Sequence, residues 1–375
     1  MLVDDGHNVH AISRHPNSTP GVTLHRRPPT QPHLRNKDFL YQWRKKNGED
    51  VAAYCKAMRA LGFFPHIVIA HSGWGEALLI KDVWPQARVV VAPEYYYNAS
   101  GYDVGFDPEF PSPAEVSTAL EQQNAITRES LDSADAIWIP TRFLATTFPT
   151  KYQERATILH EGIDTDYYAP DAHARLQLED GTWVKQGDEV ITFINRNLEP
   201  YRGFHTFVRA LPAILQERPS AKVLIVGGNV SSYSGGGGFK DQFWQPLGDF
   251  PGKDRVHFLG SISEDQVRLV LQVSALHVYL TYPFVMGLSP LEAMSCGCLC
   301  LMSDTEPVTE FLTNGVDGVT VDMLSPSALA TSAISLLATP QHSSLSMKEQ
   351  ARQSIIDRIG RKSLIDLHRA LVFGE

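Results

Sequence analysis

Long apolar runs are scarce in this chain of 375 residues. None reaches the roughly 18 consecutive residues that a membrane-spanning helix needs. The first residues are acidic and lack the basic, apolar pattern of a secretory signal peptide. Only four cysteines occur, and Cys296, Cys298 and Cys300 are too closely spaced for a disulfide framework and lack the further ligands of a zinc site. We therefore expect buried, reduced thiols and a cytoplasmic protein.

Clustered positive charge is also lacking. The net charge is −9, and no long run of Lys or Arg occurs. This balance disfavours a nucleic-acid partner, because affinity for the phosphate backbone comes mainly from clustered cations. A few local arginines suffice for a smaller anionic ligand. No basic amphipathic stretch marks a membrane contact, although a peripheral contact through a lipid-linked acceptor stays open.

Short β-branched runs alternate with longer helical stretches along the whole chain, which predicts an α/β fold with parallel sheets covered by helices. A polar helix is predicted near 115–133, and a loop-like segment at 164–189. The pattern then restarts with "VITFINR", the amphipathic "GFHTFVRALPAILQER" and the strand "AKVLIVGG". In the first half the predicted strands are 7–12, 66–70, 88–92, 136–140 and 156–160.

Two similar halves fit two Rossmann-like domains that face a cleft. We expect an N-terminal domain at residues 1–170 and a C-terminal domain at 171–355. A final helix at 356–375 is expected to cross back to the first domain.

The start of the chain departs from this pattern. "MLVDDGHNVHAISR" reads as the tail of a helix followed by what should be the second strand of the domain. One strand-turn-helix unit is expected to be missing, and apolar edges should be exposed on the neighbours of the absent strand. Translating the upstream DNA tests this expectation.

Ligands of open parallel sheets bind outside the carboxyl ends of the strands. His71 follows one predicted strand, Glu94 with three tyrosines follows the next, and Arg196 and Gly287 follow two strands of the second half. His71 is either satisfied by backbone or part of a site. Glu94 is either on a surface loop or beside a flat-faced substrate such as a sugar.

The stretch Ser289-Pro290-Leu291-Glu292 carries two competing interpretations. Ser, Pro and Glu at this spacing form a capping box, in which Glu292 serves only its own helix. Alternatively, free N–H groups at Gly287, Leu288 and Ser289 attract a diphosphate, and Glu292 accepts hydroxyl hydrogens from a ribose.

Arg196 and Arg202 flank "NLEPY" between a strand end and a helix start. Both guanidinium groups can grip phosphate oxygens there, replacing a metal for which no obvious carboxylate pair is present. The alternative is a solvated pair that is salt-bridged to Glu199. The patch "SSYSGGGG" after Gly227 and Gly228 is either a flexible loop or a turn that lines the donor.

These residues resemble a known family, the retaining glycosyltransferases of family 4, which have the GT-B fold. "FVMGLSPLEAMSCG" resembles the family motif in which two Glu residues are separated by seven others. "MSDTEPVTEFLTNGVDGVTVD" is similar to the family's next stretch and places Glu310 in a matching carboxylate position. "INRNLEPYRGFHTFVRALP" and "LHEGIDTDYYAP" are similar to the basic segment and the domain crossing, while "HSGWGE", "FDPEFP" and "YLTYPFV" resemble a bacterial subgroup.

The resemblance implies a nucleotide-diphosphate sugar as co-substrate, no further cofactor and no metal. It implies a glycan, lipid-linked or small-molecule acceptor on the N-terminal domain. By position, Arg196 and Arg202 match the diphosphate-binding pair and Glu292 the ribose-binding carboxylate, with Glu94 and His71 as further catalytic candidates. Three features depart from the family. Phe284 replaces the first motif Glu, Arg202 replaces Lys with one extra residue of spacing, and the N-terminal Gly-rich turn is absent.

Two rival functions stay open. A nucleotide-sugar 2-epimerase shares this architecture and needs no acceptor. A non-catalytic nucleotide-sugar-binding protein would fit Phe284 and the short start. Incubation with donor alone, and calorimetric titration with nucleoside diphosphates, separate these functions from glycosyl transfer in glycan biosynthesis.

Overall fold

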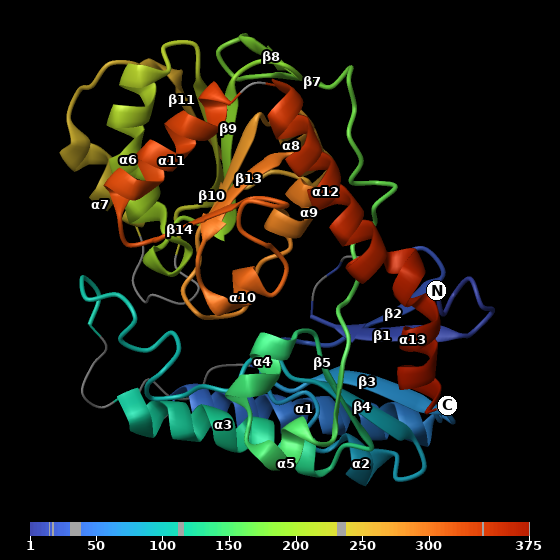
Figure 1. Cartoon of the computed structure of the whole chain (residues 1–375). Helices are drawn as coiled ribbons and strands as arrows, with labels where there is room; N and C mark the ends of the chain where they lie inside the picture. Colours follow the sequence, from blue (N-terminus) through green and yellow to red (C-terminus); the bar gives the residue numbers. More distant parts are fainter. Residues whose placement is uncertain are drawn as a thin grey trace. The chain divides into compact units, whose positions relative to one another are not determined.

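The chain folds into two compact units, and each unit is built from separate stretches of sequence (Figure 1). Unit 1 comprises Met1–Ala99, Pro113–His160 and Ile365–Glu375, and unit 2 comprises Ser100–Ser112 and Glu161–Leu364. The structure is a computed structural model that describes residues 1–14, 16, 19–30, 39–111, 116–230, 238–339 and 341–374. Residues 231–237 of the patch "SSYSGGGG" therefore lie outside the described residues. Within the described ranges, no helix combines the length and apolar character required to cross a membrane.

Unit 1 contains two parallel sheets, and no described strand of one pairs with a strand of the other. β1 pairs with β2, and the second sheet has the order β3-β4-β5-β6. The five predicted runs of the first half all form strands, and β2 is a further one. The bounds are β1 (Val9–Ser13), β2 (Val22–Arg26), β3 (Ile67–His71), β4 (Arg88–Ala92), β5 (Ala136–Ile139) and β6 (Ala156–Ile158).

Helices cover these strands, with α1 packing against both α2 and α3. The predicted polar helix is confirmed as α3, and residue 115 at its expected start lies outside the described residues. The last residues of the chain also belong to unit 1, where Arg88 Nε on β4 donates to the carbonyl of Val372 at 3.1 Å. The helices are α1 (Phe39–Ala60), α2 (Ile80–Val83), α3 (Val116–Asp132), α4 (Arg142–Thr147), α5 (Thr150–Gln153) and α13 (Arg361–Phe373).

The edge of the second sheet exposes apolar surface. β3 is an outer strand of this sheet, and its Ile69 is 43% exposed. Met1–Gly6 forms a single hydrogen-bonded turn that Gly6 closes at φ +84°, where the tail of a helix was expected.

Unit 2 is organised around one six-stranded parallel sheet of order β11-β10-β9-β12-β13-β14. The connections from β9 run outward in one direction, and those from β12 run in the other. The boundary between β9 and β12 is therefore the switch point at which such folds bind ligands. The strands are β9 (Val190–Asn197), β10 (Lys222–Gly228), β11 (Val256–Gly260), β12 (Leu276–Tyr279), β13 (Leu299–Ser303) and β14 (Val319–Val321).

The helices of unit 2 form two packed groups. α6 and α11 lie side by side, whereas α8 and α12 both pack on α9 (Figure 1). The apolar residues of α6 recur at helical spacing, and this face is fully buried. The elements are η1 (Pro200–Arg202), α6 (Phe204–Glu217), α7 (Phe239–Trp244), η2 (Gln245–Leu247), η3 (Lys253–Arg255), α8 (Glu264–Gln272), α9 (Ser289–Ser295), α10 (Glu306–Thr309), α11 (Pro326–Ala338) and α12 (Gln341–Ile359).

The segment 164–189, expected as a loop, contains a short hairpin. β7 (Arg175–Gln177) pairs antiparallel with β8 (Trp183–Lys185). The turn between them carries Asp180-Gly181, with Gly181 at φ +83°, and Asp-Gly is a strong hairpin signal. Three-residue strands are too short to show periodicity, which explains why the pattern did not predict them.

Residues 100–112 belong to unit 2, although the chain on both sides of them belongs to unit 1. We call them the 100–112 segment. Its Asp107 is 3% exposed and accepts a hydrogen bond from Tyr282 Oη at 2.7 Å. The same carboxylate lies 3.1 Å from Nε2 of His205 on α6. Two further polar pairs are Asp103 with Tyr201 and Glu109 with Arg209.

The four cysteines are free and buried, as predicted. Burial raises the pKa of the Cys298 thiol to about 12. Such a thiol stays protonated near neutrality and acts as a small apolar packing group.

Candidate active site

In unit 2 the predicted residues gather where β9 and β12 end. Arg196 is the second-last residue of β9, and its exposed side chain forms no hydrogen bond or ion pair with any described residue. The chain then enters η1, which ends at Gly203 with φ +64°. A Cβ at Gly203 would lie 2.4 Å from Cβ of Leu280, so only glycine allows η1 to pack this closely on the segment after β12.

Arg202 has a different environment from Arg196. It is 8% exposed, and its Nη1 lies 3.0 Å from Tyr279 Oη, 2.8 Å from Thr281 Oγ1 and 2.8 Å from the carbonyl of Val285. The alternative of a solvated arginine pair is therefore wrong for Arg202, because the carboxyl end of β12 encloses it. Tyr279 and Thr281 were not predicted, although both lie in the quoted "YLTYPFV".

One phenol oxygen joins two of the predicted site residues. Tyr279 Oη accepts from Arg202 and also from the backbone N–H of Gly287, at 2.7 Å. The expectation of a free N–H at Gly287 is therefore wrong, since the hydroxyl already occupies it. The two hydrogen bonds to Tyr279 Oη hold the backbone at Gly287 in place. The next residue, Leu288, is 46% exposed.

Phe284 packs rather than faces a ligand. It is 1% exposed, and its ring lies 5.5 Å from that of Tyr201 and 5.9 Å from the Arg202 guanidinium carbon. The expected contact with a donor sugar is therefore wrong for this ring, which supports the buried arginine instead.

The capping box at the start of α9 is not formed. Leu288 occupies the cap position, and no side chain caps the helix. Ser289 Oγ instead donates to the carbonyl of Ile194 on β9 at 3.0 Å. The capping box predicted from the sequence does not form because the Ser289 hydroxyl donates to a carbonyl that is distant in sequence. This bond links α9 to β9, the strand that contains Arg196.

Glu292 is therefore available for another role. It is partly buried in the first turn of α9, where it bonds with the side chain of Tyr168. Burial raises the pKa of Glu292 to about 7; the Tyr168 bond opposes this shift and the charge of Glu264 adds to it. A carboxylate held in this way, with no cation paired to it among the described residues, can accept hydrogen bonds from hydroxyl groups.

The remaining donor-side candidates have packing roles. A Cβ at Gly227 would lie 2.8 Å from Leu198, and one at Gly228 would lie 2.6 Å from Asn197 Oδ1, so these glycines let β10 approach the end of β9. Glu310 ends α10, and its carbonyl accepts from Arg358 Nη2 at 2.6 Å.

In unit 1 the structure brings His71 and Glu94 together. They follow the neighbouring strands β3 and β4, and Nε2 of His71 lies 3.8 Å from Oε2 of Glu94. The N–H of Gly73 donates to Nδ1 of His71 at 3.1 Å, which leaves the proton of the neutral ring on Nε2, facing the carboxylate. Both side chains are about 40% exposed, so a ligand can reach this pair.

The described residues contain no group of three or more His, Cys, Asp and Glu side chains suited to hold a metal ion. Two functional features escaped sequence reasoning, namely the Tyr279 link and the buried Arg44 of unit 1 discussed below. The first could have been sought in the polar residues of "YLTYPFV", whereas no local signal marks the second.

Comparisons with known proteins agree with this architecture. Residues 5–168 match the family described as "Glycosyl transferase family 4 group", and residues 179–354 match "Glycosyl transferases group 1". Together the two matches span most of the chain.

Characterised relatives are distant. A "GDP-mannose-dependent alpha-(1-6)-phosphatidylinositol monomannoside mannosyltransferase" of Mycolicibacterium smegmatis is 23% identical over 72% of this chain and 67% of its own length. A "D-inositol 3-phosphate glycosyltransferase" of Nocardiopsis dassonvillei is 26% identical over 73% of this chain, but the match covers only 59% of that relative.

Solved structures share the fold at low identity. A sucrose-phosphate synthase from Thermosynechococcus elongatus aligns over 100% of this chain and 91% of its own, with a TM-score of 0.76 and 17% identity. The Anabaena protein HepE, solved in complex with UDP and glucose, aligns over 95% of this chain and 87% of its own, with a TM-score of 0.66 and 16% identity. From these matches and the parallel sheets of its two units, we conclude that the chain belongs to the group 1 glycosyltransferases of family 4, which have the GT-B fold.

Proposed function

We propose that the protein transfers a sugar from a nucleotide-diphosphate sugar to an acceptor hydroxyl, with retention of anomeric configuration and without a bound metal ion. The observation that carries the proposal is Arg196. It is an exposed cation at the switch point of the unit 2 sheet, and it has no partner among the described residues. A departing nucleoside diphosphate develops negative charge, and a fixed guanidinium group stabilises that charge.

Arg202 has a supporting role in this proposal. Its contacts with Tyr279, Thr281 and Val285 position the backbone that leads to Leu288 and Ser289. We therefore assign Arg196 to the diphosphate and Arg202 to the positioning of the chain around it. Glu292 accepts hydroxyl hydrogens of the donor ribose, for which its partly buried carboxylate is suited.

His71 and Glu94 serve the acceptor side. An exposed carboxylate can accept the proton of an attacking hydroxyl group, and the Nε2–H of His71 faces the Glu94 carboxylate and orients it. The names of relatives support transfer to small or lipid-linked acceptors, because they specify phosphatidylinositol monomannoside, D-inositol 3-phosphate and L-malate. The donors named are GDP-mannose in relatives and UDP-glucose in a solved neighbour.

A donor screen tests the proposal. We expect the purified protein to be stabilised against heat by at least one of UDP-glucose, UDP-N-acetylglucosamine and GDP-mannose. With that donor and an acceptor panel of glycerol, inositol phosphate and malate, transfer is measured by release of the nucleoside diphosphate. The anomeric configuration of the product is read by NMR, and an assay in chelator tests the metal.

The Arg196→Ala variant should lose on the order of 100-fold in rate, because it removes one preorganised donor to the leaving group. Arg175→Ala, which removes another exposed arginine of unit 2, is the matched control and should keep its rate. Normal turnover of Arg196→Ala would contradict the assignment. A changed sugar in the absence of acceptor would instead support an epimerase.

A further inference from the structure

Arg44 of unit 1 is a buried cation without a partner. It lies on α1, is 6% exposed, and forms no hydrogen bond or ion pair with any residue in the described ranges. Its Nε is fully enclosed and unpaired, whereas its two terminal nitrogens are not fully enclosed. Buried arginines are normally paired, because an unpaired buried charge is costly. An unpaired one that still reaches the surface is typical of a binding group.

Two more polar atoms near Arg44 lack partners. Ser72 is 1% exposed and its hydroxyl is unpaired, and Oε2 of Glu76 is enclosed and unpaired. Both lie in the turn that follows β3. This turn packs on α1 at Arg44, since a Cβ at Gly75 would lie 2.2 Å from the Arg44 carbonyl oxygen. The ring of Trp74 from the same turn stacks on the guanidinium group, 5.2 Å from its carbon.

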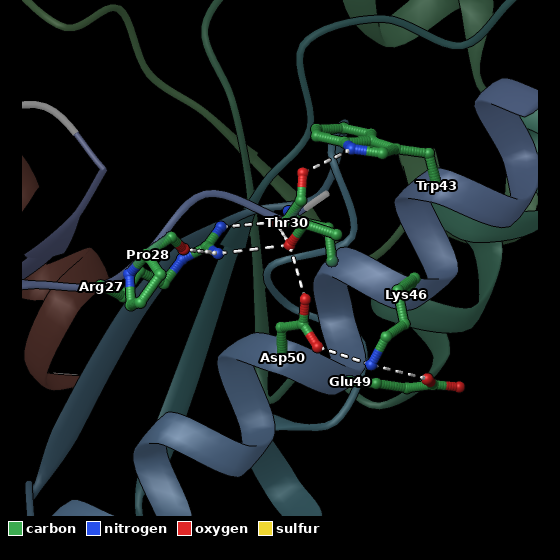
Figure 2. Close-up of polar contacts among 8 residues, drawn as sticks. Arg27, Pro28, Thr30, Trp43, Lys46, Glu49 and Asp50 are labelled. Atoms are coloured by element: carbon green, nitrogen blue, oxygen red, sulfur yellow. Dashed lines mark hydrogen bonds and ion pairs between the residues drawn. The ribbon is translucent and has the colours of Figure 1, made fainter. Parts of the chain in front are cut away.

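A rigid polar network holds the turn and the helix in place. Asn47 on α1 donates to the carbonyl of Trp74 at 2.9 Å and accepts from Arg27. Figure 2 shows the continuation of this network, in which Thr30 bonds Asp50 at 2.9 Å and Lys46 pairs with Asp50 at 2.7 Å. The guanidinium group of Arg44 is therefore fixed by its surroundings while its own hydrogen-bonding capacity is left unused.

The charges around Arg44 leave room for an anion. Burial lowers the pKa of Arg44, and electrostatic interactions with the ionisable groups of Tyr97, Glu94 and Glu76 oppose that shift. Glu94 and Glu76 make no ion pair with it, although Glu94 lies in the pair with His71 proposed above to meet the acceptor. The unpaired cation is thus in the same neighbourhood as the residues assigned to the acceptor hydroxyl.

We propose that Arg44 binds an oxyanion of the acceptor, namely a phosphate or carboxylate group. This inference rests on the proposed glycosyl transfer, because it names the chemical class of that reaction's acceptor. A planar guanidinium group whose two terminal nitrogens are accessible and unpaired binds such groups bidentately, and the Trp74 ring stacks on it.

Binding of simple anions tests the site directly. We expect glycerol 3-phosphate or inorganic phosphate to raise the melting temperature of the protein and to give a calorimetric titration, while glycerol does neither. Arg44→Gln should weaken this binding by at least about tenfold. Lys45→Gln, which removes an exposed cation one residue away on α1, is the matched control and should bind normally. Vesicles of phosphatidylcholine with and without phosphatidylglycerol distinguish a lipid phosphate from a free one.

The outcomes separate this inference from the proposed function. Because Arg44 has no partner, Arg44→Gln without ligand should melt at or above the temperature of the unmodified chain. A lower melting temperature together with unchanged anion binding would show that Arg44 is structural and would overturn the inference. Failure of every anion and vesicle to bind would overturn it as well. Binding of UDP or GDP reports on the donor site and is measured on the same proteins. A protein that binds neither nucleotide counts against the proposed function, whereas a protein that binds no anion counts against this inference alone.

Discussion

Two buried arginines, one in each unit, have nearly the same exposure and opposite surroundings. Arg202 is 8% exposed and its Nη1 meets three acceptors, whereas Arg44 is 6% exposed and meets none among the described residues. Both side chains are buried, but among the described residues only Arg202 has hydrogen-bond acceptors. Burial alone therefore does not distinguish a structural cation from a binding cation, and the hydrogen-bond partners do.

The largest effect is expected at Arg202, the buried arginine that has hydrogen-bond acceptors. Arg202→Met should lower the free energy of unfolding by about 3–5 kcal/mol, because it leaves the acceptors of a buried charge without a donor. Urea denaturation measures the change. Arg44→Met is the matched variant and should cost less than about 1 kcal/mol, since no partner loses its bond. Equal losses in the two variants would refute the distinction drawn here.

The buried carboxylate of Asp107 in unit 2 has hydrogen-bond partners, and its loss should therefore also destabilise the fold. Asp107→Asn should cost about 2–4 kcal/mol of unfolding free energy, because it weakens the bonds from Tyr282 and His205. Glu109→Gln, which breaks an exposed pair in the same segment, is the control and should cost at most about 1 kcal/mol.

The pH dependence of Asp107 sharpens this prediction. Burial alone would raise its pKa, but hydrogen bonds from His205, Tyr282 and the Glu109 backbone outweigh burial and lower it from 3.8. A lowered carboxylate pKa stabilises the fold above pH 3.8, and this contribution disappears as the pH falls through the folded value. Acid titration should thus show the difference between the unmodified chain and Asp107→Asn narrowing below pH 3.8. A constant difference would contradict the stated cause.

The smallest expected effect concerns Glu292, a partly buried carboxylate on the donor side. Its pKa is raised from 4.5 to about 7, so its contribution to stability is complete below pH 4.5 and is lost as the pH rises through 7. Glu292→Gln should therefore be more stable than the unmodified chain at pH 8, by at most about 3 kcal/mol, and similar at pH 4.5. Its affinity for the donor should fall.

Glu306→Gln, at an exposed position of α10, is the control and should change neither property. Thermal unfolding at the two pH values, with and without donor, makes the measurement. A variant that loses stability at pH 8 and keeps donor affinity would place Glu292 among the structural residues.

The backbone of the fold was largely predictable because its signals are local. Apolar runs marked β3, β4 and β9, and the neighbouring strand ends placed His71 and Glu94 side by side. β2 was missed because three of its five residues are polar and none of them is fully buried. The hairpin of β7 and β8 was missed because its strands are three residues long.

The chemistry of the site was less predictable because it depends on distant partners. The sequence Ser289 to Glu292 has every local feature of a capping box, and yet the Ile194 carbonyl takes the hydroxyl. Arg202 and Gly287 were both predicted, but the Tyr279 hydroxyl that joins them was not. The lack of a partner at Arg44 is a property of the folded chain and leaves no trace in sequence.

The membership of the 100–112 segment has a practical consequence. The chain contributes this short stretch to unit 2, returns to unit 1, and enters unit 2 again at Glu161. A fragment that begins at Glu161 therefore lacks Asp107, which contacts Tyr282 and His205. Cutting the protein before Glu161 would then yield a C-terminal fragment in which the polar side chains of Tyr282 and His205 have lost Asp107. Adding a synthetic peptide of these thirteen residues in trans should restore that fragment, as in split-protein complementation.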